Sequence, residues 1–296
     1  MTTMELYEPR SLEEATSLLA ERGDEARIIA GGTAVVLMLK NRLIAPSALI
    51  SLEAVQSLRY IRSDADGTLR IGAMTTIREL ERSPVVIDHC PTLARTCRQV
   101  ANVRVRHAAT IGGNLSEADY ASDPPSVLVA ARARVRVASA KGEREIPLAE
   151  WFRDFFETAL RPDEVVTEVI IPWDTLSSRS AYVKYVSRSS EDRPCLGVAA
   201  FMDLDEDLDG GYVCRELRVV VGAAAATPQE VPSAEKLAIR KRLTPELIQE
   251  IAEGYANAID PISDLRGSAW YRTQLIRVFV RDAINEALAS QPEELK

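Results

Sequence analysis

The sequence is poor in the residues that most often hold metals. Its 296 residues include 2 histidines and 4 cysteines. The cysteines form no C-x-x-C pair, and no histidine–cysteine group has the spacing of a zinc or iron–sulfur site. We therefore expect buried free thiols in a reducing compartment and no metal site on this chain.

Long hydrophobic runs and an excess of positive charge are also missing. No apolar run approaches the ~20 residues of a membrane-spanning helix, and the first residues lack the basic-then-apolar pattern of a secretory signal. The 36 basic and 44 acidic residues give a net charge of −8, which argues against binding nucleic acid or an anionic membrane. We expect a cytoplasmic protein with no membrane span and no nucleic-acid partner.

Length and patterning predict two domains. A domain averages ~150 residues, and 46% hydrophobic with 27% charged residues is ordinary globular composition. The polar, serine-rich segment 174–180 is the best linker candidate, so the predicted domains are 1–175 and 176–296. Within the first, helix–strand alternation divides subdomains of about 1–56 and 57–175. The second reads as strands, with a hairpin turn at Asp209-Gly210-Gly211, followed by two closing helices, an α+β pattern.

The first candidate binding motif is a glycine pair. Ala30-Gly31-Gly32-Thr33 lies between a predicted strand at 26–30 and a predicted helix at 34–40. Backbone N–H groups without neighbouring Cβ atoms can point together at an anion, and the helix start adds positive potential. The spacing matches neither a Rossmann nor a Walker loop. A plain turn is the alternative interpretation.

A second motif, Thr110-Ile111-Gly112-Gly113-Asn114, repeats this chemistry. Two such loops with bare amides suggest two clamps on one diphosphate. Asp123, which precedes a proline pair, could accept hydrogen bonds from ribose hydroxyls or an adenine amine. Alternatively, Asp123 only starts a turn.

Arginines gather in two places, and their role is a separate question. Nucleic-acid binding would need interleaved aromatic residues, which are only 5% of the chain. A solvated strand face or a subunit contact explains the arginines better. The two groups are Arg95, Arg98, Arg104, Arg106 with His107, and Arg132, Arg134, Arg136 on one strand face.

Taken in order, these motifs resemble the FAD-binding medium subunit of molybdenum hydroxylases, of the xanthine dehydrogenase and aerobic carbon monoxide dehydrogenase type. The resemblance covers nearly the whole chain. Besides the glycine motifs and Asp123 it includes Ile71-Gly72-Ala73 with Thr75-Thr76, the turn Leu160–Glu164, the strand Tyr182-Val183-Lys184-Tyr185, and the segment Ser263–Arg272.

The resemblance implies a fold and a cofactor. The expected fold class is α+β: a vanillyl-alcohol-oxidase (PCMH)-type FAD-binding domain of two α/β subdomains, then an α+β domain of the carbon monoxide dehydrogenase flavoprotein C-terminal type. The glycine motifs would hold the diphosphate of non-covalent FAD, Asp123 would contact the adenosine side, and Lys184 would lie near the flavin. The expected FAD-binding residues are Ile29, Ala30, Gly31, Gly32, Thr33, Ala34, Val35, Val36, Val100, Ala101, Thr110, Ile111, Gly112, Gly113, Asn114, Asp123, Val169, Ile170 and Lys184.

The resemblance also implies partners. A molybdopterin large subunit would oxidise the substrate, an iron–sulfur small subunit with [2Fe-2S] clusters would relay the electrons, and the complex would be a dimer of heterotrimers. FAD here would pass electrons to an external acceptor, with no catalytic acid, base or nucleophile on this chain. The substrate stays open, as does the acceptor: NAD, quinone, oxygen or a protein carrier.

Two departures and two alternatives accompany this interpretation. Thr33-Ala34 stands where the carbon monoxide enzymes commonly have His-Ser, and Glu191–Cys195 stands where some relatives have an aromatic residue over the flavin. One alternative is a stand-alone FAD oxidoreductase of the same fold, such as a UDP-N-acetylenolpyruvoylglucosamine reductase. The other is a non-enzymatic interaction module that uses the arginine faces.

Overall fold

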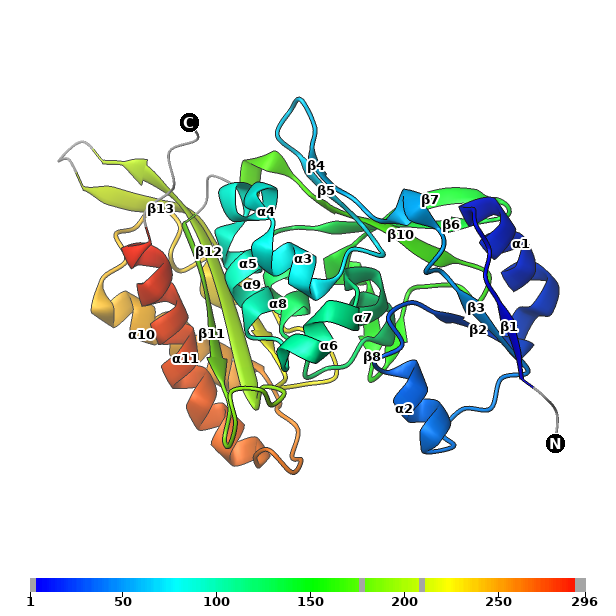
Figure 1. Cartoon of the computed structure of the whole chain (residues 1–296). Coiled ribbons are helices and arrows are strands. Elements are labelled where there is room, and N and C mark those ends of the chain that lie inside the picture. The colour runs from blue at the N-terminus through cyan, green and yellow to red at the C-terminus, as the bar shows by residue number, and fades with distance from the viewer. Residues whose placement is uncertain (1–3, 176–178, 208–210, 291–296) are drawn as a thin grey trace.

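The computed structural model describes residues 4–175, 179–207 and 211–290. These residues form three hydrophobic cores, one in each of three bodies. Figure 1 shows the N-terminal body at one end, a central body rich in short helices, and the C-terminal sheet with its long helix at the other end. Within the described ranges, none of the helices combines the length and apolar character that a bilayer-crossing segment needs.

The N-terminal body is a parallel sheet of strand order β1-β3-β2. The Ser11 hydroxyl accepts a hydrogen bond from the backbone N–H of Glu14 and so caps α1, which buries Ala15 and Leu19 against the sheet. The predicted strand and helix around the first glycine pair are confirmed. The elements are β1 (Glu5–Tyr7), α1 (Leu12–Arg22), β2 (Ala26–Ile29), α2 (Val35–Lys40) and β3 (Ala48–Ser51).

The central body is built on an antiparallel sheet of order β4-β5-β10-β6-β7. All seven residues of its middle strand, β10, are buried. Its strands are β4 (Ile61–Ser63), β5 (Leu69–Gly72), β6 (Arg134–Ser139), β7 (Gly142–Pro147) and β10 (Val165–Ile171), with a small hairpin β8 (Phe152–Asp154) and β9 (Glu157–Thr158). Its helices are α3 (Ile77–Arg82), α4 (Pro84–His89), α5 (Pro91–Arg98), α6 (Val103–Ala108), α7 (Ile111–Glu117) and α8 (Pro124–Ala130).

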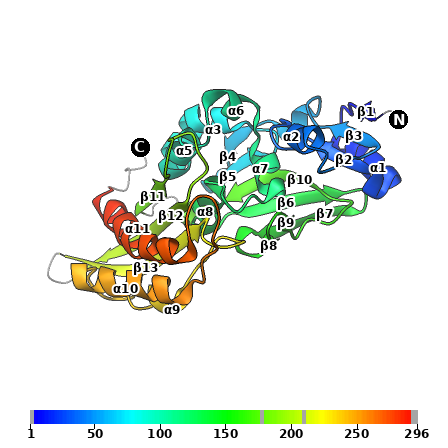
Figure 2. The same ribbon diagram turned by 90° about the horizontal axis from the view of Figure 1, so that it is seen from below.

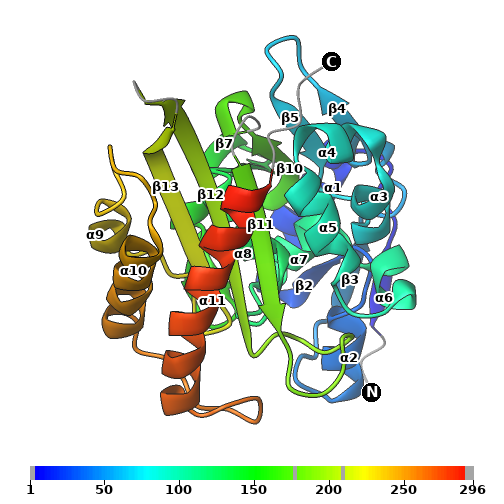
Figure 3. The same cartoon turned by 90° about the vertical axis from the view of Figure 1, so that its left-hand side faces the viewer.

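The C-terminal body is a three-stranded antiparallel sheet, β11-β12-β13, covered on both faces. Tyr182 and Phe201 face the core of the central body, whereas Ala181 and Val198 face α10 and α11. Figure 3 shows α11 lying across the outer face of this sheet. The elements are β11 (Arg179–Tyr185), β12 (Leu196–Glu206), β13 (Tyr212–Gly222), α9 (Pro232–Glu235), α10 (Pro245–Ala258) and α11 (Ala269–Ala289).

The α+β class and the two closing helices are confirmed. Between α5, which ends at Arg98, and α6, which Asn102 caps, the chain turns at Ala101, whose φ is +41°. Residues 176–178 of the linker, and Asp209-Gly210 of the hairpin turn, lie outside the described residues.

Candidate functional site

The first glycine motif joins β2 to α2 and packs directly on the central body. A Cβ on Gly31 would lie 1.6 Å from the carbonyl oxygen of Ala108, the last residue of α6. Gly32 has φ +69°, a conformation that side chains rarely adopt. Both glycines are therefore required by the path of the loop. In Figure 2 the N-terminal body adjoins the side of the central body that carries α6 and α7.

The backbone N–H groups of this loop are available to a ligand. In the described part of the chain, no hydrogen bond within the protein uses the N–H of Gly31, Gly32, Thr33 or Ala34. These residues are half-buried. Successive N–H groups without partners can bind an anion when they point together, so this donor loop, Gly31–Ala34, is a candidate site for a diphosphate.

The second glycine motif does not form the open loop that the sequence predicts. It begins α7, and the N–H groups of residues 111–114 are satisfied within the protein, so the expectation of bare amides at these residues is wrong. The donors and acceptors are Ile111 to the Thr75 carbonyl (2.9 Å), Gly112 to the Ala73 carbonyl (2.9 Å), Gly113 to the Thr110 hydroxyl (3.1 Å) and Asn114 to the Thr110 carbonyl (2.9 Å).

The two motifs nevertheless lie side by side. A Cβ on Gly113 would lie 3.7 Å from the Cβ of Ala30, and Gly31 contacts the backbone just before Thr110. A Cβ on Gly112 would lie 2.6 Å from the Cβ of Ala73, so this glycine allows α7 to pack on the end of β5. The second motif thus forms a tightly packed wall beside the donor loop.

Asp123 and Lys184, 61 residues apart, form a buried ion pair. The Lys184 Nζ lies 2.9 Å from Asp123 Oδ2 and 2.9 Å from the carbonyl oxygen of Gln99. Tyr182 donates its hydroxyl to Asp123 Oδ1 at 2.8 Å. The lysine and aspartate side chains are 4% and 5% exposed. Each oxygen of Asp123 therefore accepts one hydrogen bond within the protein, and the expected contact with the adenosine side of FAD stays a prediction.

Burial dominates the electrostatics of this group. It raises the pKa of Asp123 above its ordinary value, against the lowering effects of the Lys184 charge and of the hydrogen bonds from Lys184 and Tyr182. The pKa of Tyr182 is well above its ordinary value, because the phenol is buried and lies beside the Asp123 carboxylate. Tyr182 therefore stays a hydrogen-bond donor at neutral pH.

Lys184 also lines a cleft of about 590 Å³ between the central and C-terminal bodies. Ala101, one of the expected FAD-binding residues, lines this cleft. Glu191 also lines it, and belongs to the loop in which some relatives carry an aromatic residue over the flavin. The other lining residues are Arg98, Gln99, Asn102, Val103, Arg106, Val186 and Ser190.

Some predicted residues are not brought to this cleft. Val169 is 0% exposed and Ile170 is 6% exposed, because both lie in the middle strand of the central sheet. The side-chain amide of Asn114 pairs with the Ser122 hydroxyl. Ile29, Val35 and Val36 flank the donor loop on β2 and α2.

Two residues of the site are not among those predicted from the sequence. Tyr182 donates a hydrogen bond to the Asp123 oxygen that Lys184 does not contact, and the Gln99 carbonyl accepts a hydrogen bond from Lys184. The alternation of β11 carried the signal for Tyr182, since residues 182 and 184 share one face of a strand. Nothing local marks Gln99, because its contribution is a backbone carbonyl at the end of α5.

The arginine strand face is neutralised by carboxylates. Arg134 and Arg136 pair with Glu145 on the neighbouring strand at 3.3 and 2.8 Å, and Arg136 also pairs with Glu168 at 3.1 Å. A face whose positive charges are already paired is a poor binding surface for a polyanion.

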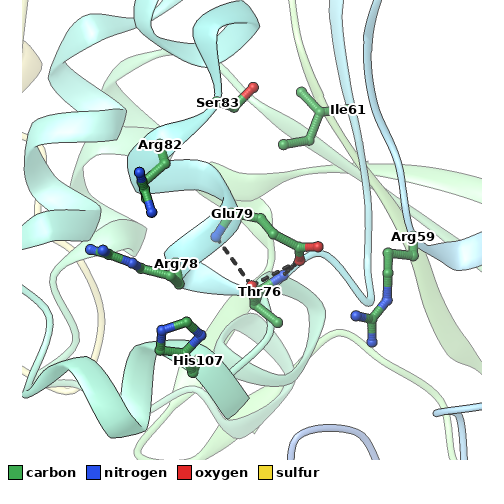
Figure 4. Close-up of a pocket in the computed structure, with 8 residues that line it drawn as sticks. All are labelled: Arg59, Ile61, Thr76, Arg78, Glu79, Arg82, Ser83 and His107. Atoms are coloured by element: carbon green, nitrogen blue, oxygen red, sulfur yellow. Dashed lines mark hydrogen bonds between the residues drawn. The ribbon is translucent and has the colours of Figure 1, made fainter.

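A second cleft, of about 660 Å³, lies beside α3 and contains none of the predicted cofactor residues (Figure 4). Figure 4 shows Arg78, Arg82 and His107 on one side of Glu79 and Arg59 on the other. Glu79 accepts hydrogen bonds from the backbone N–H and the hydroxyl of Thr76, so it caps α3. The family-like Thr75-Thr76 motif thus has a structural role here.

The four cysteines are free and buried, as predicted. Among the described residues, no group of three or more histidine, cysteine, aspartate or glutamate side chains is placed to hold a metal ion.

Comparisons with known proteins agree with this arrangement. Residues 2–174 match the family model of the FAD binding domain in molybdopterin dehydrogenase, and residues 181–287 match the CO dehydrogenase flavoprotein C-terminal domain. Subunit alpha of the 6-hydroxypseudooxynicotine dehydrogenase complex of Paenarthrobacter nicotinovorans is 35% identical, covering 94% of this chain and 92% of that one. A carbon monoxide dehydrogenase structure from Hydrogenophaga pseudoflava superposes with a TM-score of 0.92 at 31% identity, covering 97% of this chain and 98% of that one.

Proposed function

The chain belongs to the FAD-binding medium subunits of the molybdenum hydroxylases, and from this premise we propose that it is the electron-transfer subunit of a larger complex. It is thus an oxidoreductase subunit. In the proposed function it holds FAD non-covalently, takes electrons from an iron–sulfur subunit and passes them to an external acceptor.

The observation that carries this proposal is the pairing of a donor loop with a lysine-lined cleft. The free N–H groups of Gly31–Ala34 lie at one end of α6, against Ala108, and the cleft with Lys184 lies at the other, beside Val103. A helix of six residues spans about 9 Å. A diphosphate site and a planar-ring site separated in this way fit an extended dinucleotide such as FAD.

The residues of the chain would bind and tune the cofactor. The loop N–H groups would hold the diphosphate, and the Lys184 ammonium would stabilise negative charge on the reduced ring. Bound FAD supplies the ability to take up and release electrons. In this proposal, no side chain of the chain acts as an acid, base or nucleophile toward an organic substrate.

The proposed partners are an iron–sulfur small subunit with [2Fe-2S] clusters and a molybdopterin large subunit, in a cytoplasmic dimer of heterotrimers. Relatives are subunits of multi-subunit enzymes named for nicotine, glyceraldehyde and carbon monoxide. Such different substrates on similar flavin subunits support a substrate pocket on another chain. The domain boundary near residue 175 is part of the same proposal.

The test follows electrons through the complex purified by a tag on this chain. The complex is reduced with dithionite and then mixed with NAD⁺, a quinone or oxygen, with and without prior removal of FAD. We expect fast reoxidation by one acceptor with FAD present, and iron–sulfur clusters that stay reduced without FAD. Equal rates in both preparations would contradict the proposed electron path.

The stand-alone alternative has its own assay. A UDP-N-acetylenolpyruvoylglucosamine reductase would oxidise NADPH when the isolated chain is given that enolpyruvoyl nucleotide. We expect no such oxidation, and sustained turnover would replace the proposed function with this alternative.

A further inference from the structure

We propose that Asp123, Tyr182 and the Gln99 carbonyl are positioning groups that fix the Lys184 ammonium at the flavin cleft and thereby set the midpoint potential of the cofactor. This inference rests on the proposed function, because it takes the ring of FAD to lie in the cleft that Lys184 lines. It gives Asp123 a different role from the adenosine contact that the sequence suggests.

The geometry leaves the lysine one donor for a ligand. An ammonium has three N–H groups. Asp123 and Gln99 each engage one at 2.9 Å, and no other partner of Lys184 occurs in the described part of the chain. The remaining N–H belongs to a side chain that lines the cleft. Because two bonds hold the nitrogen, the third donor has a defined position.

Burial makes the lysine depend on its partners. At 4% exposure, an ammonium without a counter-charge is strongly destabilised. Asp123 keeps the charge in place, and Tyr182 holds Asp123 from the opposite side. A Cβ on Gly197, the residue paired with Lys184 in the sheet, would lie 2.2 Å from the Tyr182 hydroxyl, so the tyrosine has room only because residue 197 is glycine.

The hydrogen bonds of this group also connect the central body to the C-terminal body across their interface. Asp123 precedes α8 and Gln99 follows α5 in the central body, while Tyr182 and Lys184 lie on β11 of the C-terminal body. A second buried hydrogen bond crosses the same interface on the same face of β11, where the hydroxyls of Thr92 and Ser180 lie 2.8 Å apart. Ser180 is not among the residues that line the cleft.

Two possible roles for Asp123 predict opposite changes in the FAD midpoint potential of the Asp123→Asn variant. If the carboxylate acted on the flavin by its charge alone, Asp123→Asn would remove negative charge near the ring and raise the potential. If it positions Lys184, the same variant releases the cation and lowers the potential. If loss of the cation weakens the binding of reduced FAD tenfold relative to the binding of oxidised FAD, the two-electron midpoint potential falls by about 30 mV.

The experiment measures the FAD midpoint potential of the complex by redox titration, together with FAD content, for Lys184→Met, Asp123→Asn, the double variant and Tyr182→Phe. We expect Lys184→Met and Asp123→Asn to lower the potential, the double variant to lower it no further than Lys184→Met, and Tyr182→Phe to lower it by less. Ser180→Ala is the matched control and leaves the potential unchanged.

A higher potential in Asp123→Asn, or effects of the two single variants that add, would overturn the inference. If Asp123→Asn fails to fold, Tyr182→Phe still tests the inference, because it removes one hydroxyl and leaves the ion pair. An unchanged midpoint potential in Tyr182→Phe also counts against the inference. Wild-type protein without FAD would overturn the proposed function as well, whereas bound FAD with unmoved potentials would overturn this inference alone.

Discussion

At the scale of the residue, Gly31 shows how a missing Cβ builds a binding loop. Its Cα packs so closely on α6 that a Cβ would overlap the Ala108 carbonyl at 1.6 Å. The sequence marked this glycine as a donor to an anion. The structure adds that it is also a packing residue, which no local pattern reveals because Ala108 is 77 positions away.

Gly31→Ala should therefore weaken FAD binding at least tenfold, about 1.4 kcal/mol. The added methyl group must push the loop off α6 and misalign its N–H groups. The measurement is a fluorescence titration of the FAD-depleted chain with FAD, with circular dichroism to check folding. Gly254→Ala in α10, where the new Cβ would lie 3.0 Å from the Cβ and 3.8 Å from the Cα of Ala234, is the control for a methyl group added outside the donor loop. Equal affinities for both variants would contradict the role of the loop.

Asp264 is a second decisive residue, far along the chain from the glycine motifs. It accepts hydrogen bonds from Tyr120 and Arg272, both at 2.7 Å, and Arg266 lies 2.8 Å away. Arg272 is 0% exposed. Burial raises the pKa of Asp264, but the hydrogen bonds from Tyr120 and Arg272 outweigh this effect and hold it well below its ordinary value.

Asp264→Asn should lower the free energy of unfolding by about 3 kcal/mol at pH 7, because it leaves the buried Arg272 without its counter-charge. A depressed carboxyl pKa stabilises the fold above the unfolded value of ~3.9 and loses that effect as the pH falls toward the folded value. The difference between wild type and variant should be constant from pH 7 to 5 and shrink below pH ~4. Urea unfolding at stepped pH measures it, and a difference that grows on acidification would refute the account.

At the scale of the element, α7 explains why the second motif was misread. The pattern of small residues was correct, but Ile111 and Gly112 donate to Thr75 and Ala73, more than 30 residues earlier. The strand–glycine–helix unit from residue 26 to 40 could be predicted, since its signals are local. The Asp123–Lys184 pair could not, because their meeting depends on how β11 docks on α5 and α8.

Thr110→Val tests the cap of α7. It removes the hydroxyl that accepts from the Gly113 N–H, and such a loss costs about 1 kcal/mol. It should also weaken FAD binding, because the first turn of α7 packs beside Ala30. Thr244→Val removes the equivalent cap of α10, with its bond to the Leu247 N–H, and should lower stability by a similar amount without changing FAD affinity. Thermal unfolding and FAD titration of both variants give the comparison, and unchanged FAD affinity in Thr110→Val would refute the link.

At the scale of the whole molecule, several large apolar side chains are exposed. Leu265 is 94% exposed, Trp270 71% and Phe156 52%. Large apolar side chains in water are typical of contact surfaces when they cluster. In the proposed complex, iron and molybdenum would be held by other chains.

The complex captured by a tag on this chain should contain iron and molybdenum, and the chain purified alone should contain neither. The reason is that the ligands for both metals would come from partner subunits. Elemental analysis and native mass measurement of the two preparations provide the check. Iron or molybdenum bound in fixed ratio to the isolated chain would contradict this division.

The central claim is that this chain holds FAD without a covalent link, and the FAD content of the purified full-length chain tests it most directly. We predict a flavin absorption spectrum with one FAD per chain, all of it released into the supernatant when the protein is denatured by heat. A folded chain that neither carries nor takes up FAD, or flavin that stays with the denatured protein, would contradict the account.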